Sequence, residues 1–357
     1  MKKRLDQFQS FRFLVFLSVI LVHADTYTSH VKNIAIPISL SGMVFFFILS
    51  GFLTGYGKYG ETVELSLRSI FTYVWRKLKK FYPLYLFSVL AQVVFTSIPW
   101  HIANFEFAEA VPDILVVLKH ALLLQAWIPH GYFAYIGGSW FLSAILFLYA
   151  ITLPLLTVIN SIKGDFKSRF KKLLPLLAVC LVYSIAFNLF GARRNLEFFT
   201  HVLPLLRIGE YFAGMILGQL VRQYLCEKPG FPAEKKKIIS ILEIAALTFS
   251  TLLAVVFAPK GDFWYSRDVY WIIPNMILIT VFSFGAGPVS ALFKNRYLVF
   301  LGDIAFECYI LHTLILSLYH AVSPDYGGIT VLGNFCSFIF CLLTTVFLSA
   351  LIHKRKS

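Results

Sequence analysis

The sequence predicts an all-α fold, a polytopic membrane protein with ten transmembrane helices. Of the 357 residues, 58% are hydrophobic and 14% are charged, and the mean hydropathy is +0.75. Soluble domains carry about 25% charged residues, so this composition argues against a soluble protein. Apolar runs of about the length that crosses a bilayer recur along the whole chain.

Ten apolar segments divide the chain, and the shorter ones lie near the spanning limit of about 17 residues. They cover residues 11–28, 34–56, 81–100, 139–158, 173–190, 199–220, 238–258, 270–284, 298–319 and 331–352. No repeat with a period of about 20 to 50 residues marks a separate unit. We therefore expect one integral membrane domain over residues 1–357.

The positive charge is concentrated on one side of the predicted membrane. The formal net charge is +14, and 24 of the 32 Lys and Arg residues lie near the two termini or in alternate connections between segments. These connections are 58–80, 159–172, 221–237 and 285–297. Lys and Arg are in excess in cytoplasmic loops, so we expect both termini in the cytoplasm and no nucleic-acid partner.

The five cysteines form no metal-binding pattern. No CxxC pair and no Cys/His cluster has metal-ligand spacing. We expect these cysteines to pack as small hydrophobic side chains, and we expect no metal site.

One outward connection, residues 101–138, is long. Its middle is apolar but interrupted by charge, and counting it as a span would reverse the charge bias of every later connection. We expect an interfacial or re-entrant element that covers the outer mouth of the bundle and contacts the substrate on that side. Its charged residues and histidines are His101, Glu106, Glu109, Asp113, Lys119, His120 and His130.

Arg12 and His23 are ionisable residues inside the first apolar segment. Eleven residues at about 100° and 1.5 Å each place them on nearly one helical face, about 16 Å apart along the axis. One interpretation is structural, with Arg12 snorkelling to the cytoplasmic boundary and His23 forming an interhelical hydrogen bond. The other is functional, because intramembrane ionisable groups face a partner, water or the bundle interior. A neutral His23 can then act as a general base.

A dense basic cluster precedes the third segment and consists of Arg76, Lys77, Lys79 and Lys80. At a cytoplasmic mouth it can hold phosphate groups. The ordinary alternative is that it marks a cytoplasmic helix start, since two lysines and a proline repeat the pattern at the fifth segment.

Further ionisable residues lie in later segments. Arg207 and Glu210 are three apart on one predicted helix and are expected to form an ion pair. Asp303 and Glu307 are one turn apart, and His312 lies deeper in the ninth segment. Packing alone does not retain so many buried ionisable groups, so we expect a polar cavity within the bundle.

Small and aromatic residues mark two more stretches. Ser50 and Gly51 are expected to let a neighbouring helix approach closely, and Ser50 has no base nearby in the sequence. Trp140 stands where an interfacial aromatic residue is common. Together with Tyr132 and Tyr135, it can equally stack on a sugar ring.

These stretches together resemble the bacterial integral membrane acyltransferases of the acyltransferase-3 family. The resemblance covers nearly the whole chain and rests on the order of several short motifs. The matching positions are Arg12 and His23; Phe45, Phe46 and Ser50 to Leu53; a basic pair before Pro83; Trp140 to Ser143 with Tyr149; Arg207 to Gly218; and Tyr309 to His312.

The resemblance implies an O-acyltransferase, most often an O-acetyltransferase, in the bacterial cytoplasmic membrane. Its donor is acetyl-CoA or another acyl-CoA, and its acceptor is a hydroxyl of a cell-surface polysaccharide or a lipid-linked precursor. His23 is then the general base or a transient acyl carrier, and Arg12 orients the donor or stabilises the oxyanion. Arg76, Lys77 and Lys80 hold the CoA phosphates, which do not enter hydrocarbon cheaply.

The sequence departs from the family pattern at four positions. Two family arginines before the proline are Lys77 and Lys80 here, which keeps the charge but loses the bidentate fork for phosphate. The acidic residue that often precedes the FF pair is Met43, and the glutamate that often follows the tryptophan motif is Ile145. The roles of those two carboxylates must be absent or displaced.

A transporter or flippase for lipid-linked saccharides is the alternative from another class. Such proteins often contain inverted repeats and paired helices broken by Gly or Pro, and no convincing pair is present in the sequence. A membrane scaffold without catalysis is disfavoured by the number of buried charges.

Overall fold

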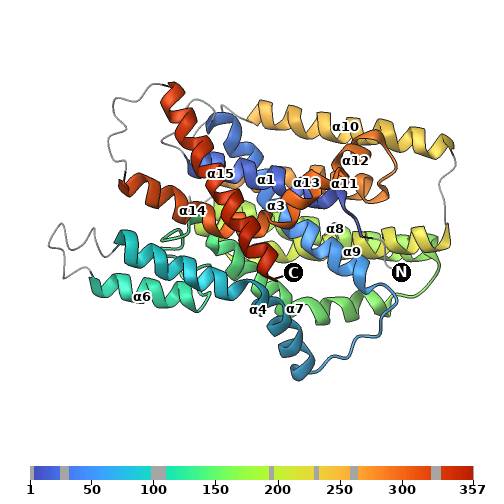
Figure 1. Ribbon diagram of the computed structural model, residues 1–357. Helices are drawn as coiled ribbons and strands as arrows, with labels where there is room; N and C mark the ends of the chain where they lie inside the picture. Colours follow the sequence, from blue (N-terminus) through green and yellow to red (C-terminus); the bar gives the residue numbers. More distant parts are fainter. Residues whose placement is uncertain are drawn as a thin grey trace.

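The computed structural model describes residues 4–24, 32–97, 110–192, 197–228, 233–257, 264–322 and 331–356. Over these residues the protein is helical without a strand, which confirms the all-α prediction (Figure 1). The α-helices are α1 (Gln7–His23), α3 (Lys32–Lys58), α4 (Leu67–Gln92), α6 (Ala110–Ala121), α7 (Trp140–Ser161), α8 (Phe166–Ala192), α9 (Ile208–Glu227), α10 (Ala233–Phe257), α11 (Ile272–Phe284), α12 (Pro288–Phe293), α13 (Arg296–Asp303), α14 (Ala305–Val322) and α15 (Val331–Lys356). Short π-helical or 3-10 turns lie at Val93–Ser97, Gly137–Ser139, Phe198–Val202, Pro204–Arg207 and Trp264–Trp271.

Seven helices in the described part of the chain are long and apolar enough to cross a membrane. They are Ala35–Lys58, Leu67–Phe95, Gly137–Ser161, Phe166–Gly191, Lys235–Val256, Ala305–Val322 and Gly333–Arg355. Two shorter apolar helices, Gln7–His23 and Asp268–Phe284, accompany them. The protein is therefore a multi-pass membrane protein.

Helix α1 begins at Gln7, among polar residues that precede the predicted segment. The Gln7 side-chain amide donates to the carbonyl of Phe282 at 2.6 Å, and the Ser10 hydroxyl donates to that of Phe293 at 2.5 Å. These bonds give the buried Gln7 NH2 group and the buried Ser10 hydroxyl an acceptor, so the helix can start there. His23 consequently lies in the last turn of α1, rather than in the middle of a span. Residues 25–28 of the predicted segment lie outside the described part.

Helix α4 begins at Leu67, well before the predicted start at residue 81. The side chain of Ser66 caps it by accepting from the backbone N–H of Ser69 at 3.1 Å. The basic cluster, which we expected in a connection, therefore lies on the helix itself. Its side chains have fixed helical directions.

Two predicted segments are broken into shorter elements. The sixth becomes a π-helical turn, a 3-10 turn that starts at Pro204, and then α9. Proline lacks the N–H that would continue a helix. The ninth is divided at Ile304 between α13 and α14.

Residues close to both termini contact the chain at this second break. Arg4 forms an ion pair with Asp303 at the end of α13. His353, near the end of α15, lies 3.7 Å from Glu307 at the start of α14. The N- and C-terminal segments therefore meet at the junction of α13 and α14.

Helices α3 and α9 pack with almost no side chains between their backbones. Gly51 and Gly55 on α3 and Gly214 and Gly218 on α9 lie in this contact, and a Cβ atom at any of them would overlap a backbone oxygen of the other helix. Small residues four apart are a common means of close helix approach in membranes. The prediction for Gly51 is confirmed.

Candidate active site

The centre of the candidate site is a pair of histidines from α1 and α14. Nδ1 of His23 lies 2.7 Å from Nε2 of His312. The two rings are nearly parallel, at 17°, with centroids 5.0 Å apart. His312 is fully buried, whereas the side chain of His23 is exposed. One imidazole is therefore fixed in the protein, and the other is open to a reactant.

One turn of α14, from Tyr309 to His312, contacts both the His23 ring and the backbone of Gly138. His312 donates from Nδ1 to the carbonyl oxygen of Tyr309 at 2.8 Å, and the Tyr309 hydroxyl donates to the carbonyl of Gly138 at 2.6 Å. Gly137 borders His23, since a Cβ atom there would lie 3.5 Å from its Nε2. The sequence showed His312 as a polar residue in a span, but it gave no sign that His312 contacts His23.

Arg12 lies closer to the N-terminal end of α1 than His23 does, on the same helical face. Its Nη1 donates to Oε1 of Gln9 at 3.1 Å, and the guanidinium interacts electrostatically with Tyr149 and Asp303. With eleven residues between Arg12 and His23, the two are about 16 Å apart along the helix axis. They belong to one face but do not form one catalytic pair.

Lys77 is the member of the basic cluster that turns toward Arg12. Its ammonium lies 5.0 Å from the ring centroid of Tyr149 and 5.5 Å from that of Tyr73, distances typical of cation–π contacts. Lys77 is half-buried and lies within electrostatic range of Arg12. Side chains from α1, α4 and α7 thus converge at Tyr149.

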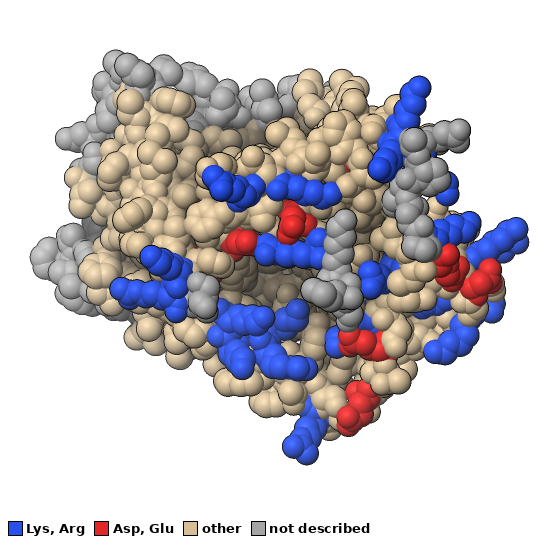
Figure 2. Space-filling model, turned by 45° about the vertical axis from the view of Figure 1, so that its right-hand side comes forward, with Lys and Arg blue, Asp and Glu red and all other residues tan. Residues whose placement is uncertain are grey.

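The other members of the cluster point outward. Arg76, Lys79 and Lys80 are exposed. Figure 2 shows Lys and Arg side chains gathered around a hollow on one face of the molecule, with acidic side chains among them. The cluster therefore combines one inward lysine with several exposed cations.

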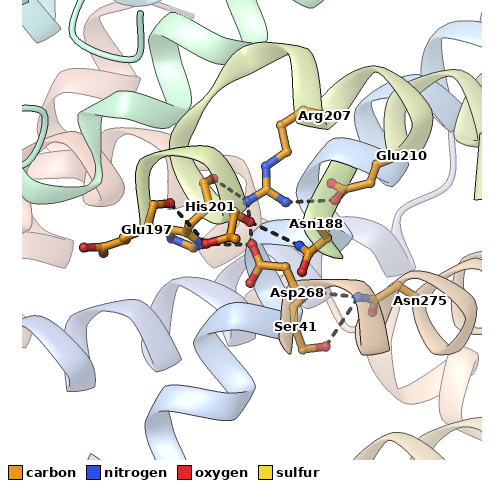
Figure 3. Close-up of polar contacts among 9 residues, drawn as sticks. Ser41, Asn188, Glu197, His201, Arg207, Glu210, Asp268 and Asn275 are labelled. Carbon is orange, nitrogen blue, oxygen red and sulfur yellow. Dashed lines mark hydrogen bonds and ion pairs between the residues drawn. The ribbon is translucent and has the colours of Figure 1, made fainter. Parts of the chain in front are cut away.

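A buried ion network lies at the start of α9 (Figure 3). Arg207 donates to Glu210 at 2.8 Å, which confirms the predicted pair, and to Asp268 at 2.5 Å. His201 lies 2.8 Å from the same oxygen of Asp268. All four side chains are almost completely buried. We did not predict His201, which lies in a separate short turn six positions before Arg207, or Asp268, which lies 61 positions after it.

Trp140 belongs to this network and is not free to stack on a sugar. Its ring centroid lies 4.6 Å from that of His201 and 5.5 Å from the Arg207 guanidinium. Its side chain is buried. The stacking interpretation is therefore wrong for Trp140.

The outward element is helix α6 followed by a chain of turns. His120 donates to the carbonyl of Gly131 at 3.0 Å, and its own carbonyl accepts from the Tyr85 hydroxyl of α4 at 2.9 Å. Gln125 donates to the carbonyl of Ser139 at 2.8 Å. These bonds attach the element to α4 and to the start of α7. His101, Glu106 and Glu109 lie outside the described residues, as does the side chain of Asp113.

No group of three or more His, Cys, Asp or Glu side chains within the described ranges could hold a metal ion. The polar groups of the candidate site are instead imidazoles, cations and tyrosine hydroxyls. Such groups suit proton transfer and the binding of an anionic ligand.

Comparison with known proteins gives one match. A family model described as an acyltransferase domain, Acyl_transf_3, matches residues 5–354, nearly the whole chain. No curated protein and no solved structure matches.

Proposed function

The chain belongs to this acyltransferase family, and from that premise we propose that it is a membrane O-acetyltransferase. The proposed donor is cytoplasmic acetyl-CoA. The proposed acceptor is a hydroxyl of a cell-surface polysaccharide or of its lipid-linked precursor. The observation that carries the proposal is the exposed imidazole of His23, which contacts the buried imidazole of His312.

The proposed location is the bacterial cytoplasmic membrane, with ten spans and both termini in the cytoplasm. The distribution of Lys and Arg supports this orientation. The contacts of Arg4 with Asp303 and of His353 with Glu307 are consistent with it, since they bring the N- and C-terminal segments together at the junction of α13 and α14.

The proposed donor site is the basic mouth between α1, α4 and α7. The CoA phosphates would be held by Arg76 and Lys80, which are exposed, and by Lys77, which lies further inside. Phosphates are strongly disfavoured in hydrocarbon, so they stay at the mouth while the uncharged pantetheine arm extends inward. Arg12 lies at the start of that path and would orient the arm.

The reaction would take place at the outward end of α1. His23 would accept the proton of the acceptor hydroxyl while the oxygen attacks the thioester carbonyl. The tetrahedral intermediate would then collapse, breaking the carbon–sulfur bond, and the thiolate would take the proton from His23. Of the two roles for Arg12, orientation of the donor is favoured, because about 16 Å of helix separates it from His23.

Labelled acetyl-CoA and proteoliposomes test the proposal. The purified protein is reconstituted with the saccharide fraction of a bacterial envelope on the side opposite acetyl-CoA. Transfer of label to saccharide, dependent on the protein, is the expected result. Saccharide movement across the bilayer without acetyl-CoA and without transfer would support a transporter or flippase instead.

A further inference from the structure

We propose that His312 is a positioning residue that fixes the proton of His23 on Nδ1. This leaves Nε2 of His23 as the atom that accepts the proton of the substrate hydroxyl. The inference rests on the proposed function for its catalytic consequence. The proton arrangement itself can be measured without any substrate.

The hydrogen bonds of His312 fix the position of its own proton. Its Nδ1 lies 2.8 Å from the carbonyl oxygen of Tyr309, and a second carbonyl, that of Cys308, also interacts with this ring. A carbonyl oxygen only accepts hydrogen bonds. Nδ1 of His312 must therefore carry a proton, and in the neutral ring Nε2 carries a lone pair.

The proton on Nδ1 of His312 in turn determines the tautomer of His23. Two ring nitrogens 2.7 Å apart require one proton between them. Because Nε2 of His312 holds a lone pair, the proton belongs to Nδ1 of His23. The hydroxyl of Thr313, 3.4 Å from the same Nε2, can at most add a second, weaker donor. Nε2 of His23 is then unprotonated.

The unprotonated nitrogen of His23 is accessible to a substrate hydroxyl. Nε2 of His23 lies beside Gly137, which has no side chain, and His23 is exposed. His312 cannot turn away, since it is fully buried with Phe16 edge-on at 5.8 Å. The arrangement resembles the orienting role of the carboxylate in hydrolase triads, in which a buried acceptor selects the tautomer of the catalytic imidazole.

Two substitutions separate an acceptor role from simple packing. Glutamine at position 312 places an oxygen near the place of Nε2, so His312→Gln can still accept from His23. Leucine fills similar space but cannot accept a hydrogen bond.

We expect His312→Leu to lower kcat for acetyl transfer about 100-fold or more, within the range of general-base catalysis, with KM for acetyl-CoA unchanged. His312→Gln should keep most of the activity, and His320→Leu, at an exposed position on α14, should keep all of it.

Nitrogen NMR of the full-length protein in lipid bilayers, with ¹⁵N-labelled histidine, measures the tautomers directly. The signal of His23 is identified by its loss in His23→Asn. We expect a protonated Nδ1 and an unprotonated Nε2 on His23 in the wild type and in His312→Gln, and a shift toward the Nε2–H tautomer in His312→Leu.

A protonated Nε2 on His23 in the wild type, or an unchanged tautomer in His312→Leu, would overturn the proposal. Equal losses of kcat in the Gln and Leu variants, both folded by size-exclusion and thermal unfolding, would overturn it as well. Absence of transfer by the wild type would instead count against the proposed function, because the NMR result does not depend on turnover.

Discussion

His23 and His312 lie in contact at 2.7 Å although 289 positions separate them in the chain. The contact depends on α1 and α14, which the chain brings together from its two ends. The same turn of α14 also holds Gly138 through the Tyr309 hydroxyl. One helical turn near the C-terminus therefore positions the reactive group of the first helix and the backbone beside it.

Substitution of Lys77 should weaken donor binding more than substitution of Lys79. The two lysines lie on opposite faces of α4, and Lys77 alone turns toward Arg12 and Tyr149. A charge-assisted hydrogen bond contributes about 1.5–3 kcal/mol, so Lys77→Ala should raise KM for acetyl-CoA about tenfold or more. Lys79→Ala should change it less than about twofold. Equal effects of the two variants in steady-state kinetics would remove Lys77 from the donor site.

The glycine contact between α3 and α9 predicts a position-specific loss of stability. An alanine at position 55 would overlap the backbone of α9, and such overpacking costs about 1–3 kcal/mol. At Gly57, in the same helix, an added Cβ meets no atom within 4 Å. Thermal unfolding in detergent should show a lower Tm for Gly55→Ala, and an unchanged or higher Tm for Gly57→Ala, because alanine favours the helix. The reverse order would contradict the close packing.

The Arg207 network should be essential for folding stability. Removing one partner of a buried ion pair costs about 3–5 kcal/mol, because the remaining charges are left uncompensated. Arg207→Met should therefore lower the Tm strongly, whereas Arg68→Met, at an exposed position, should not.

Neutralising the acidic partners tests the physical reason for that loss. Adding Glu210→Gln and Asp268→Asn to Arg207→Met removes the uncompensated carboxylates, so part of the lost Tm should return. If the triple variant is less stable than Arg207→Met alone, packing rather than charge explains the loss.

Because His120 is buried, we expect the free energy of unfolding of the protein to fall at acidic pH. Burial lowers its pKa from about 6.5 to about 4. Between these two pH values, His120 is protonated in the unfolded chain but neutral in the folded protein. The free energy of unfolding should therefore fall as the pH is lowered from 6.5 to 4, and the contribution of His120 is complete above pH 6.5.

Melting curves across this pH interval, with two variants, isolate the contribution. Glutamine can still donate to the Gly131 carbonyl but does not titrate, so His120→Gln should show a weaker pH dependence of Tm than the wild type. His130→Gln, at an exposed position, should keep the wild-type dependence. Identical profiles for His120→Gln and the wild type would refute the assignment.

The sequence predicted the long helices because an apolar run of spanning length leaves few alternatives in a membrane. Helices α3, α7 and α15 lie close to their predicted segments. The sequence did not predict the break at Ile304, since residues 298–319 contain no proline and an apolar run lies on each side of it. It also missed the early start of α1, which depends on hydrogen bonds from Gln7 and Ser10 to distant carbonyls.

The same distinction applies to the candidate site. Arg207 and Glu210 were paired correctly, because residues three apart on a helix are neighbours. Asp268 and His312 were not assigned to their partners, because those contacts join segments far apart in the chain. A single sequence carries no signal for such contacts.

The most direct test of the account is acetyl transfer by His23→Ala. The measurement is the rate of label transfer from acetyl-CoA to envelope saccharide in proteoliposomes, with His320→Ala as a matched control and equal amounts of folded protein. Loss of a general base lowers the rate by about 10²–10⁴-fold, so we predict near-complete loss in His23→Ala and a wild-type rate in His320→Ala. Retained turnover by folded His23→Ala would contradict the account.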